Sequence, residues 1–416
     1  MARQRQHQSF IFGIALRAVA VALAIAIVFA LTVLATQSAQ AQTFTVLHDF
    51  TRGKDGASPE VGLSIDGAGN LFGTANSGGS AGFGTVFELA QKGRSFGFRV
   101  LHSFTGGSVG STDGGGPAAR VVFGPNGTLY GSTTFGGNSN GGTVYNLGPA
   151  ARLRTETILY SFTAGSDGDR PSGDLIFDQA GNIYGTTSFG GSTFNGTTFE
   201  LTPSGSGFTE DLLYNFTGGN DGADPVAGVI SDAAGNLYGT AGVGGAFGFG
   251  TVFELTGSGS SRTEQTLYSF QDASDGAIPN GGLIFDASGN LYGTTSSGGS
   301  GGGGTVFKLT PSAGSFTFSL LFSFTGRGGP GASLTMDAAG NLYGTTTNDG
   351  AFGQGSVFKL TPSGGSYTLT SLHDFTGGTD GGAPFSNVIF DAVGNLYGTA
   401  SQGGANSAGV VFEITP

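Results

Sequence analysis

The chain has 416 residues, of which 82 are glycine and none is cysteine. Its hydrophobic fraction of 38% is too high for a disordered chain, and its glycines follow no three-residue period, which excludes collagen. The net charge of −12 argues against a nucleic-acid partner, because an acidic surface repels phosphate groups. The absence of cysteine excludes disulfides, thiol nucleophiles and thiolate metal sites.

The first 41 residues have the parts of an export signal in the usual order. Residues 1–17 are basic and free of acids, Ala18 to Ala35 is almost entirely apolar, and small residues stand at Ala39 and Ala41. This order is typical of a secretory signal peptide. We therefore expect residues 1–41 to be removed and the protein to be secreted, at the cell surface or in the periplasm. The alternative is that the apolar run stays uncleaved, which would be the chain's only contact with a membrane.

Residues 42–416 contain seven copies of one glycine-rich unit. The clearest marker is the second glycine of Gly-Asn-Leu-Tyr-Gly-Thr, or of a near variant, which recurs at spacings of 58, 54, 54, 54, 51 and 54 residues. A fixed period of this size indicates a solenoid, a propeller or an array. The marker glycines are Gly73, Gly131, Gly185, Gly239, Gly293, Gly344 and Gly398.

Each unit contains four short runs with the composition of strands. In the fifth copy these runs are 283–285, 290–294, 305–309 and 316–324, here called A, B, C and D. They are too short and too often interrupted by glycine to be helices, and residues 286–290 between A and B have the composition of a tight turn. Four strands joined in this way form one blade of a β-propeller.

The order of the runs predicts how the ring closes. Residues 43–50 form a D run ahead of the first complete unit, whereas the last unit ends with its C run at 410–415. The N-terminal strand is therefore expected to complete the last blade, which removes the open edges of an array. The sequence predicts an all-β, seven-bladed β-propeller with four-stranded antiparallel blades, formed by residues 42–416 as a single domain.

The unit also resembles a known family. Its parts are Gly-Leu-Ile-Phe-Asp-x-x-Gly-Asn-Leu-Tyr-Gly-Thr-Thr, then Gly-Thr-Val-Phe-Lys-Leu-Thr-Pro, then Leu-Tyr-Ser-Phe-Thr-Gly-Gly-x-Asp-Gly-x-x-Pro. These parts look like the GloVer (Gloeo/Verruco) tandem repeat of exported bacterial proteins, over essentially all of residues 43–416. The resemblance implies export and a repeat architecture, and it implies no catalytic residues. The second copy departs from the pattern, with Gly124-Pro125-Asn126-Gly127-Thr128 in place of Asp-x-x-Gly-Asn.

The B–C and D–A loops should share one face of the propeller. They are longer and more variable than the turns of the other face, so this face is the candidate binding surface. Its aspartates would bind Ca²⁺ or a cationic group, or else they serve only the turn, where an Asp before Gly caps local N–H groups. We assign no metal site, because Ca²⁺ needs six to eight oxygens and each blade offers about one Asp. These aspartates are Asp55, Asp113, Asp167, Asp221, Asp275 and Asp380.

Phenylalanines of the B–C loops are the other candidates on this face. Exposed rings would stack on sugars, whereas buried ones would only fill gaps between blades, and the absence of Trp weakens the sugar interpretation. The candidates are Phe83, Phe135, Phe189, Phe247 and Phe352.

Other polar positions recur in register and are interpreted as construction. His48, His102 and His373 occupy one repeat position that is Tyr or Phe in the other copies, so we expect them to pack and neither to catalyse nor to bind a metal. One C-run position is glutamate in four copies and Asn or Lys in the others, which indicates a solvated strand face; the glutamates are Glu88, Glu200, Glu254 and Glu413.

The repeats therefore favour a non-enzymatic exported propeller that serves as a binding or scaffold module. Its partner would be an extracellular ligand such as a glycan or a surface protein, and no nucleic acid. The alternative is an extracellular polysaccharide hydrolase or lyase, whose carboxylates would converge on the long-loop face or in the central channel. No catalytic residue and no cofactor is assigned, and Ca²⁺ is the one ion left open.

Overall fold

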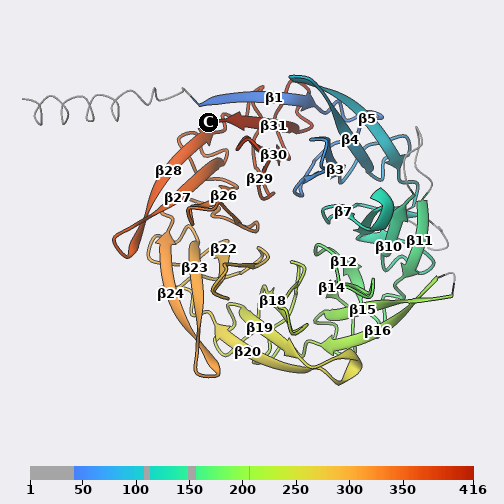
Figure 1. Cartoon of the computed structure of the whole chain (residues 1–416), viewed down its shortest axis with the longest axis vertical. Helices are drawn as coiled ribbons and strands as arrows, with labels where there is room; N and C mark the ends of the chain where they lie inside the picture. The colour runs from blue at the N-terminus through green and yellow to red at the C-terminus, as the bar shows by residue number, and fades with distance from the viewer. Residues whose placement is uncertain (1–41, 107–112, 149–155, 206) are drawn as a thin grey trace, which may run out of the picture. The chain divides into compact units, whose positions relative to one another are not determined.

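The computed structural model describes residues 42–106, 113–148, 156–205 and 207–416. Phe44–Thr415 forms one compact unit, in which seven antiparallel sheets follow one another around a centre (Figure 1). This confirms the predicted seven-bladed β-propeller. The predicted signal peptide lies outside the described residues.

Each blade begins with a two-residue A strand next to the centre and ends with a D strand at the rim. Blade 1 consists of β2 (Ser64–Ile65), β3 (Leu71–Ala75), β4 (Thr85–Lys92) and β5 (Ser95–Ser103). Blade 2 consists of β7 (Val122–Phe123), β8 (Leu129–Thr133), β10 (Thr143–Leu147) and β11 (Glu156–Ser161). Blade 3 consists of β13 (Ile176–Phe177), β14 (Ile183–Phe189), β15 (Thr197–Ser204) and β16 (Gly207–Asn215). Blade 4 consists of β17 (Ile230–Ser231), β18 (Leu237–Ala241), β19 (Thr251–Thr256) and β20 (Thr263–Ser269). Blade 5 consists of β21 (Ile284–Phe285), β22 (Leu291–Thr295), β23 (Thr305–Ser312) and β24 (Ser315–Ser323). Blade 6 consists of β25 (Thr335–Met336), β26 (Leu342–Thr346), β27 (Ser356–Ser363) and β28 (Ser366–Asp374).

Blade 7 confirms the predicted closure. It consists of β29 (Ile389–Phe390), β30 (Leu396–Ala400), β31 (Val410–Thr415) and, as its outermost strand, β1 (Thr43–Asp49) (Figure 1). The two ends of the chain are also joined beyond the ladder, since the Phe50 N–H donates to the Gly409 carbonyl at 3.1 Å and the Ala405 N–H to Asp49 Oδ1 at 2.8 Å.

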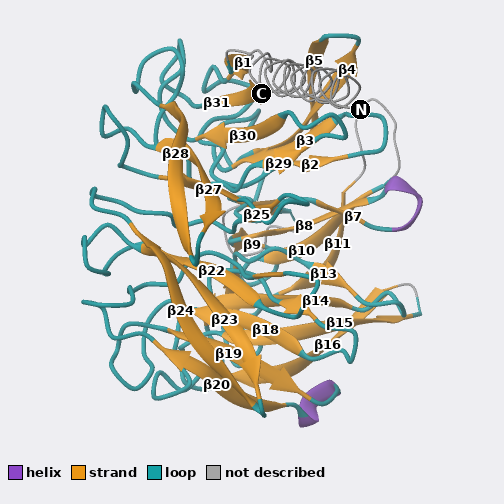
Figure 2. Cartoon of the chain, turned by 60° about the vertical axis from the view of Figure 1, so that its left-hand side comes forward, coloured by secondary structure: helices purple, strands orange, loops and turns teal. Residues whose placement is uncertain are grey.

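A few short elements lie outside the blades. Strand β12 (Asp169–Pro171) extends the sheet of blade 3, and β6 (Gly114–Gly115) pairs with β9 (Phe135–Gly136). Two single-turn 3₁₀ helices, η1 (Pro125–Gly127) and η2 (Gly259–Ser261), interrupt hairpins. Figure 2 shows that the longer loops project from one side of the blades, whereas the hairpin turns lie on the other.

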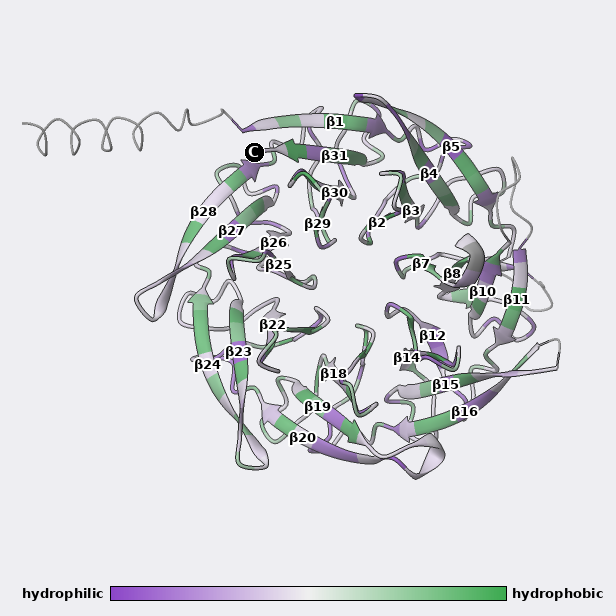
Figure 3. Cartoon of the chain, viewed as in Figure 1, coloured by the Kyte–Doolittle hydropathy of each residue, from purple (hydrophilic) through white to green (hydrophobic). Residues whose placement is uncertain are grey.

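The core lies between neighbouring blades, and the marker glycine is part of it. Phe216, at the end of the D strand of blade 3, packs edge-on against Phe253 of blade 4, with ring centroids 5.0 Å apart. Both rings are fully buried. The Phe253 ring leaves no room beside it, because a Cβ on Gly239 would lie 2.5 Å from its Cζ. Hydrophobic and hydrophilic residues alternate along the strands (Figure 3), so each blade can bury one set of side chains.

The A–B turn explains the Asp-x-x-Gly-Asn pattern. In blade 5, Asp286 Oδ1 accepts the N–H groups of Ser288 at 2.9 Å and Asn290 at 3.0 Å, while Oδ2 accepts the Asn290 side-chain amide and the Tyr292 hydroxyl. The second copy has no Asp at this place, and its turn is the 3₁₀ helix η1, which starts at Pro125.

Candidate functional site

The sequence-predicted aspartates lie in the D–A loops and are held in local networks. Asp221 is 7% exposed. Its carboxylate accepts the Thr217 N–H at 2.7 Å, the Thr217 hydroxyl at 2.5 Å and the hydroxyl of Tyr214 at 3.0 Å. These bonds tie the loop to the D strand that precedes it.

The same arrangement recurs with histidine in place of tyrosine. Asp55, Asp113 and Asp380 meet His48, His102 and His373, whereas Asp167 and Asp275 meet Tyr160 and Tyr268. The loop that follows β24 of blade 5 has no such aspartate, and the D-strand position of β24 carries Phe322. The histidines therefore pack, as expected, but they also bond a carboxylate. The sequence signal for this bond is the joint loss of both polar residues at β24 of blade 5 and the loop that follows it.

Three of these networks include a second, half-buried carboxyl group. The D-strand position that is Phe in β1, β5 and β24 is Glu156, Glu210 or Glu264 in blades 2 to 4. Burial, then the charges of Asp167 and Asp211, raises the pKa of Glu210 to about 7. The pKa of Glu264 is raised as well, chiefly by burial. These interfaces partly bury carboxyl groups, which therefore keep their protons to a higher pH than usual.

The interface of blades 1 and 2 combines both kinds of acid with a histidine. Burial and the neighbouring Asp113 raise the pKa of Glu156 to about 9. Burial alone would also raise the pKa of Asp113, but hydrogen bonds with His102, Glu156 and Thr105 outweigh it and hold that pKa well below its usual range. His102, Asp113 and Glu156 form the one group of three metal-ligating side chains found among the described residues.

The expectation of a solvated face is wrong for Glu88 and Glu200, whereas Glu254 and Glu413 are half-buried and accept hydrogen bonds from the Tyr238 and Tyr397 hydroxyls. Glu88 and Glu200 are 4% and 7% exposed. Arg99 Nε donates to Glu88 at 2.5 Å, and the Tyr184 hydroxyl donates to Glu200 at 2.8 Å. Sequence reasoning failed here because the partner of each glutamate lies on a neighbouring strand, and a polar residue at a strand position was taken to face water.

The sequence-predicted phenylalanines divide into two groups. Phe83 and Phe135 are half-buried and pack edge-on against each other, with centroids 6.1 Å apart. Phe189, Phe247 and Phe352 are 42%, 54% and 60% exposed. Phe247 and Phe352 lie on B–C loops, as the sequence analysis required of a binding face, whereas Phe189 ends strand β14 and has the guanidinium group of Arg170 over its ring, 5.0 Å from the centroid.

A cavity of about 590 Å³ lies at the centre of the propeller, where the A strands converge. Most units line the cavity with a few residues that lead from the D–A loop into the A strand. Equivalent positions of the units form a layer of the wall. The outer layer is at the loop, the middle layer just before the A strand, and the inner layer in the A strand. Most units give a loop residue to the outer layer: Glu60, Ser172, Val226, Asn280, Gly331 and Phe385. The middle layer has one residue from each unit: Gly62, Arg120, Asp174, Gly228, Gly282, Ser333 and Asn387. The inner layer is mostly isoleucine: Ile176, Ile230, Ile284, Thr335 and Ile389.

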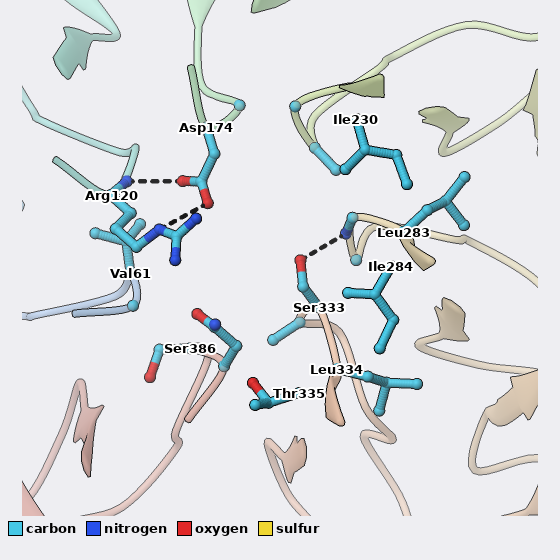
Figure 4. Close-up of a pocket in the computed structure, with 18 of the residues that line it drawn as sticks. Val61, Arg120, Asp174, Ile230, Leu283, Ile284, Ser333, Leu334, Thr335 and Ser386 are labelled. Carbon is cyan, nitrogen blue, oxygen red and sulfur yellow. Dashed lines mark hydrogen bonds and ion pairs between the residues drawn. The ribbon is translucent and has the colours of Figure 1, made fainter. Parts of the chain in front are cut away.

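One side of the cavity wall carries an ion pair. Asp174 Oδ1 accepts the backbone N–H of Arg120 at 2.9 Å, and Asp174 Oδ2 lies 3.2 Å from Arg120 Nε (Figure 4). The side chains of Arg120 and Asp174, which both line the cavity, are 32% and 37% exposed. Both charged groups are therefore accessible to solvent, and each can form hydrogen bonds with a ligand in the cavity.

The opposite side of the wall is apolar. Ile230 and Ile284 approach the centre in Figure 4. Blades 4 and 5 have glycine in the middle layer, and the Gly282 N–H is already used by the Ser333 hydroxyl at 2.9 Å. The cavity thus joins a polar wall to an apolar one, which is the usual composition of a small-molecule site.

The sequence analysis missed this wall, although it carried a signal. The middle-layer position is Gly, Arg, Asp, Gly, Gly, Ser and Asn in the seven units, whereas most positions of the repeat vary little. In a chain of near-identical units, a position that differs from unit to unit is where individual chemistry is placed.

Comparison with known proteins identifies the family. A profile described as the Gloeobacter/Verrucomicrobia repeat matches residues 28–176, 95–299 and 263–416. The chain belongs to this repeat family. The search of curated proteins found no match.

Solved structures with the same fold share little sequence with this member of the repeat family. It is similar to a protein of B. thetaiotaomicron described as the "extracellular domain of the putative one component system", at 12% identity and a TM-score of 0.57 over 89% of this chain, which spans 40% of that protein. A second is a "putative 6-phosphogluconolactonase" of Bacteroides uniformis, at 15% identity and a TM-score of 0.51, covering 82% of this chain and 89% of that one. Identities this low show the fold alone.

Among the residues that the structure describes, no helix is long and apolar enough to cross a membrane.

Proposed function

We infer that the protein is an exported binding module that holds part of a carbohydrate in its central cavity. The observation that carries this proposal is the cavity wall, where the seven units differ from one another. Its volume of about 590 Å³ lies within the range of roughly 300–1,000 Å³ that is usual for small-molecule sites. Export is inferred from the basic, apolar and small-residue segments of residues 1–41.

The wall has the groups that sugars use. Arg120, Asp174 and Asn280 supply donors and acceptors for hydroxyl groups, while Ile230 and Phe385 supply apolar surface for the C–H face of a sugar ring. Phe385 is 48% exposed at the outer layer. The ionisable residues of the wall are Glu60, Arg120 and Asp174, and two of them form an ion pair. This supports binding in preference to catalysis.

Carbohydrate binding is tested by screening the protein on a glycan array and measuring the best ligand by calorimetry. The variant Gly331→Leu places a side chain in the outer layer, where the equivalent residues of other units already carry one. A Cβ at Gly331 meets nothing closer than the Ser296 Cβ at 3.8 Å, so the fold should tolerate it. We expect at least about a tenfold loss of affinity, because the side chain occupies ligand space.

The matched control is Gly67→Leu. Gly67 lies in an A–B turn, and a Cβ there meets nothing within 4 Å. This variant should bind like the wild type. An array without ligands, or equal affinity in Gly331→Leu, would overturn carbohydrate binding in the cavity.

A polysaccharide hydrolase or lyase is the second candidate, because two unlike carboxyl groups line the same cavity. Burial raises the pKa of Glu60, although more than a third of this residue is exposed, whereas Asp174 is held beside a guanidinium group. Glycoside hydrolysis uses two carboxyl groups in different surroundings, one as the acid and the other as the base or nucleophile. Release of reducing ends from the array ligands, lost in Glu60→Gln and in Asp174→Asn, would favour this candidate over simple binding.

A further inference from the structure

Three potential metal ligands meet at the rim between blades 1 and 2. His102 comes from β5 of blade 1, Asp113 from the loop that follows it, and Glu156 from β11 of blade 2. His102 Nε2 lies 3.5 Å from Asp113 Oδ1 and 3.7 Å from Glu156 Oε2. One ligand atom from each of the three residues lies within 4.8 Å of the other two.

The distances from the histidine suit a metal ion better than hydrogen bonds. Bonds of about 2.1 Å to a tetrahedral Zn²⁺ place ligand atoms about 3.4 Å apart. The two distances from His102 are close to this value and are long for hydrogen bonds. The equivalent pairs without a glutamate are tighter, at 3.3 Å for His48–Asp55 and 3.1 Å for His373–Asp380.

The cluster is also enclosed. The side chains of His102, Asp113 and Glu156 are 18%, 14% and 11% exposed. Glu156 shares a hydrogen bond with Asp113, but its Oε1 atom is buried and has no hydrogen-bond partner. A buried carboxylate oxygen without a partner is unfavourable unless it meets a proton donor or a cation. The cluster therefore has an unused acceptor as well as three converging ligands.

The rest of the propeller shows that this combination is particular to one interface. The positions equivalent to Glu156 are Phe44 and Phe98 beside the other two histidines, and each of these rings stacks on its histidine with centroids 3.7 Å apart. The other glutamates, Glu210 and Glu264, lie next to Tyr160 and Tyr214. Only between blades 1 and 2 do the described residues combine His, Asp and Glu.

We propose that His102, Asp113 and Glu156 bind a divalent transition-metal ion of the Zn²⁺ class, which links blade 1 to blade 2. A histidine with two carboxylates fits Zn²⁺, Mn²⁺ or Co²⁺, whereas Ca²⁺ prefers an all-oxygen set of six or more ligands. The ion takes three protein ligands, and water fills the remaining position. Because it crosses a blade interface of a chain without cysteine, it stabilises the ring as a disulfide would in another exported protein.

Two variants taken from the protein's own repeats provide the test. Glu156→Phe reproduces the interfaces of Phe44 and Phe98, and His102→Tyr reproduces those of Tyr160 and Tyr214, so both should fold. The untagged protein is titrated with Zn²⁺ by calorimetry, and its metal content after dialysis is measured by mass spectrometry. The absorption spectrum with Co²⁺ reports the coordination geometry.

We expect one Zn²⁺ per chain, a melting temperature that rises with Zn²⁺, and the visible bands of Co²⁺ in a low-coordinate site. Either variant should weaken binding by more than about 100-fold, because each removes one of three protein ligands. The proposal is overturned if the wild type binds no Zn²⁺, Mn²⁺ or Co²⁺, or if both variants still bind one equivalent with unchanged affinity. The second result would place the ion elsewhere.

Discussion

The blade interfaces and the cavity wall are built from the same repeat, yet they differ in how much the copies vary. At the interfaces, Phe216 with Phe253 and Tyr214 with Asp221 have counterparts in most blades. In the wall, the corresponding units present Arg120, Asp174 and glycine at one position. The comparison teaches that repetition in this protein builds the frame, while the departures from repetition mark the surface that distinguishes one unit from another.

The largest expected effect is on the frame, at its closure. Deleting residues 43–50 removes β1 and the fully buried Phe50, and exposes the edge of β31. We expect aggregation or a loss of at least about 5 kcal/mol in the free energy of unfolding, since a strand and a core phenylalanine are lost together. Thermal melting and light scattering measure both, with a chain that starts at residue 42 as the control. Equal melting of the two chains would contradict closure by β1.

A smaller effect is expected when one loop network is removed. Asp221→Ala leaves the Tyr214 hydroxyl and the Thr217 N–H without their acceptor, so we expect a loss of about 2–3 kcal/mol in the free energy of unfolding. The double variant Tyr214→Phe,Asp221→Ala resembles β24 of blade 5, which has Phe322 and no aspartate in the loop after it, so it should lose less than the sum of the single variants. Urea unfolding of the four proteins gives the coupling. If the losses in the free energy of unfolding of the two single variants add up to that of the double variant, Tyr214 and Asp221 do not interact.

The smallest expected change of stability depends on pH. The pKa of Glu210 is raised from 4.5 to about 7 in the folded protein. Between these values the folded state keeps a proton that the unfolded chain has lost, so this group's contribution to stability falls as pH rises from 4.5 to 7. Glu210→Phe, which copies Phe98, removes this dependence. Its gain in the free energy of unfolding should therefore be about 1–2 kcal/mol larger at pH 8 than at pH 4.5.

Urea unfolding at the two pH values measures this difference, and Glu210→Gln is the control that keeps the size of the side chain. The gain of Glu210→Gln should show the same pH dependence. Equal gains at both pH values would mean that Glu210 ionises freely in the folded protein.

The number of blades and the closure of the ring could be predicted from the sequence, whereas the residues of the candidate site could not, and the reason is physical. Repeat spacing and the displaced run at residues 43–50 determine the number of blades and the closure, because both depend only on chain order. The burial of Glu200 and the pairing of Tyr214 with Asp221 depend on which side chains meet in space. The residues of the cavity wall were harder still to predict, because they are far apart in the chain and come together only when the ring closes.

The most direct test of the central claim compares the wall with the exposed loops in one binding measurement. The affinity for the best array glycan is measured for Gly331→Leu and for the triple variant Phe189→Ser,Phe247→Ser,Phe352→Ser. We expect Gly331→Leu to lose at least about tenfold in affinity at an unchanged melting temperature, and the triple variant to bind within about twofold of the wild type. Loss of binding in the triple variant, with full affinity in Gly331→Leu, would contradict the claim and place the site on the loops.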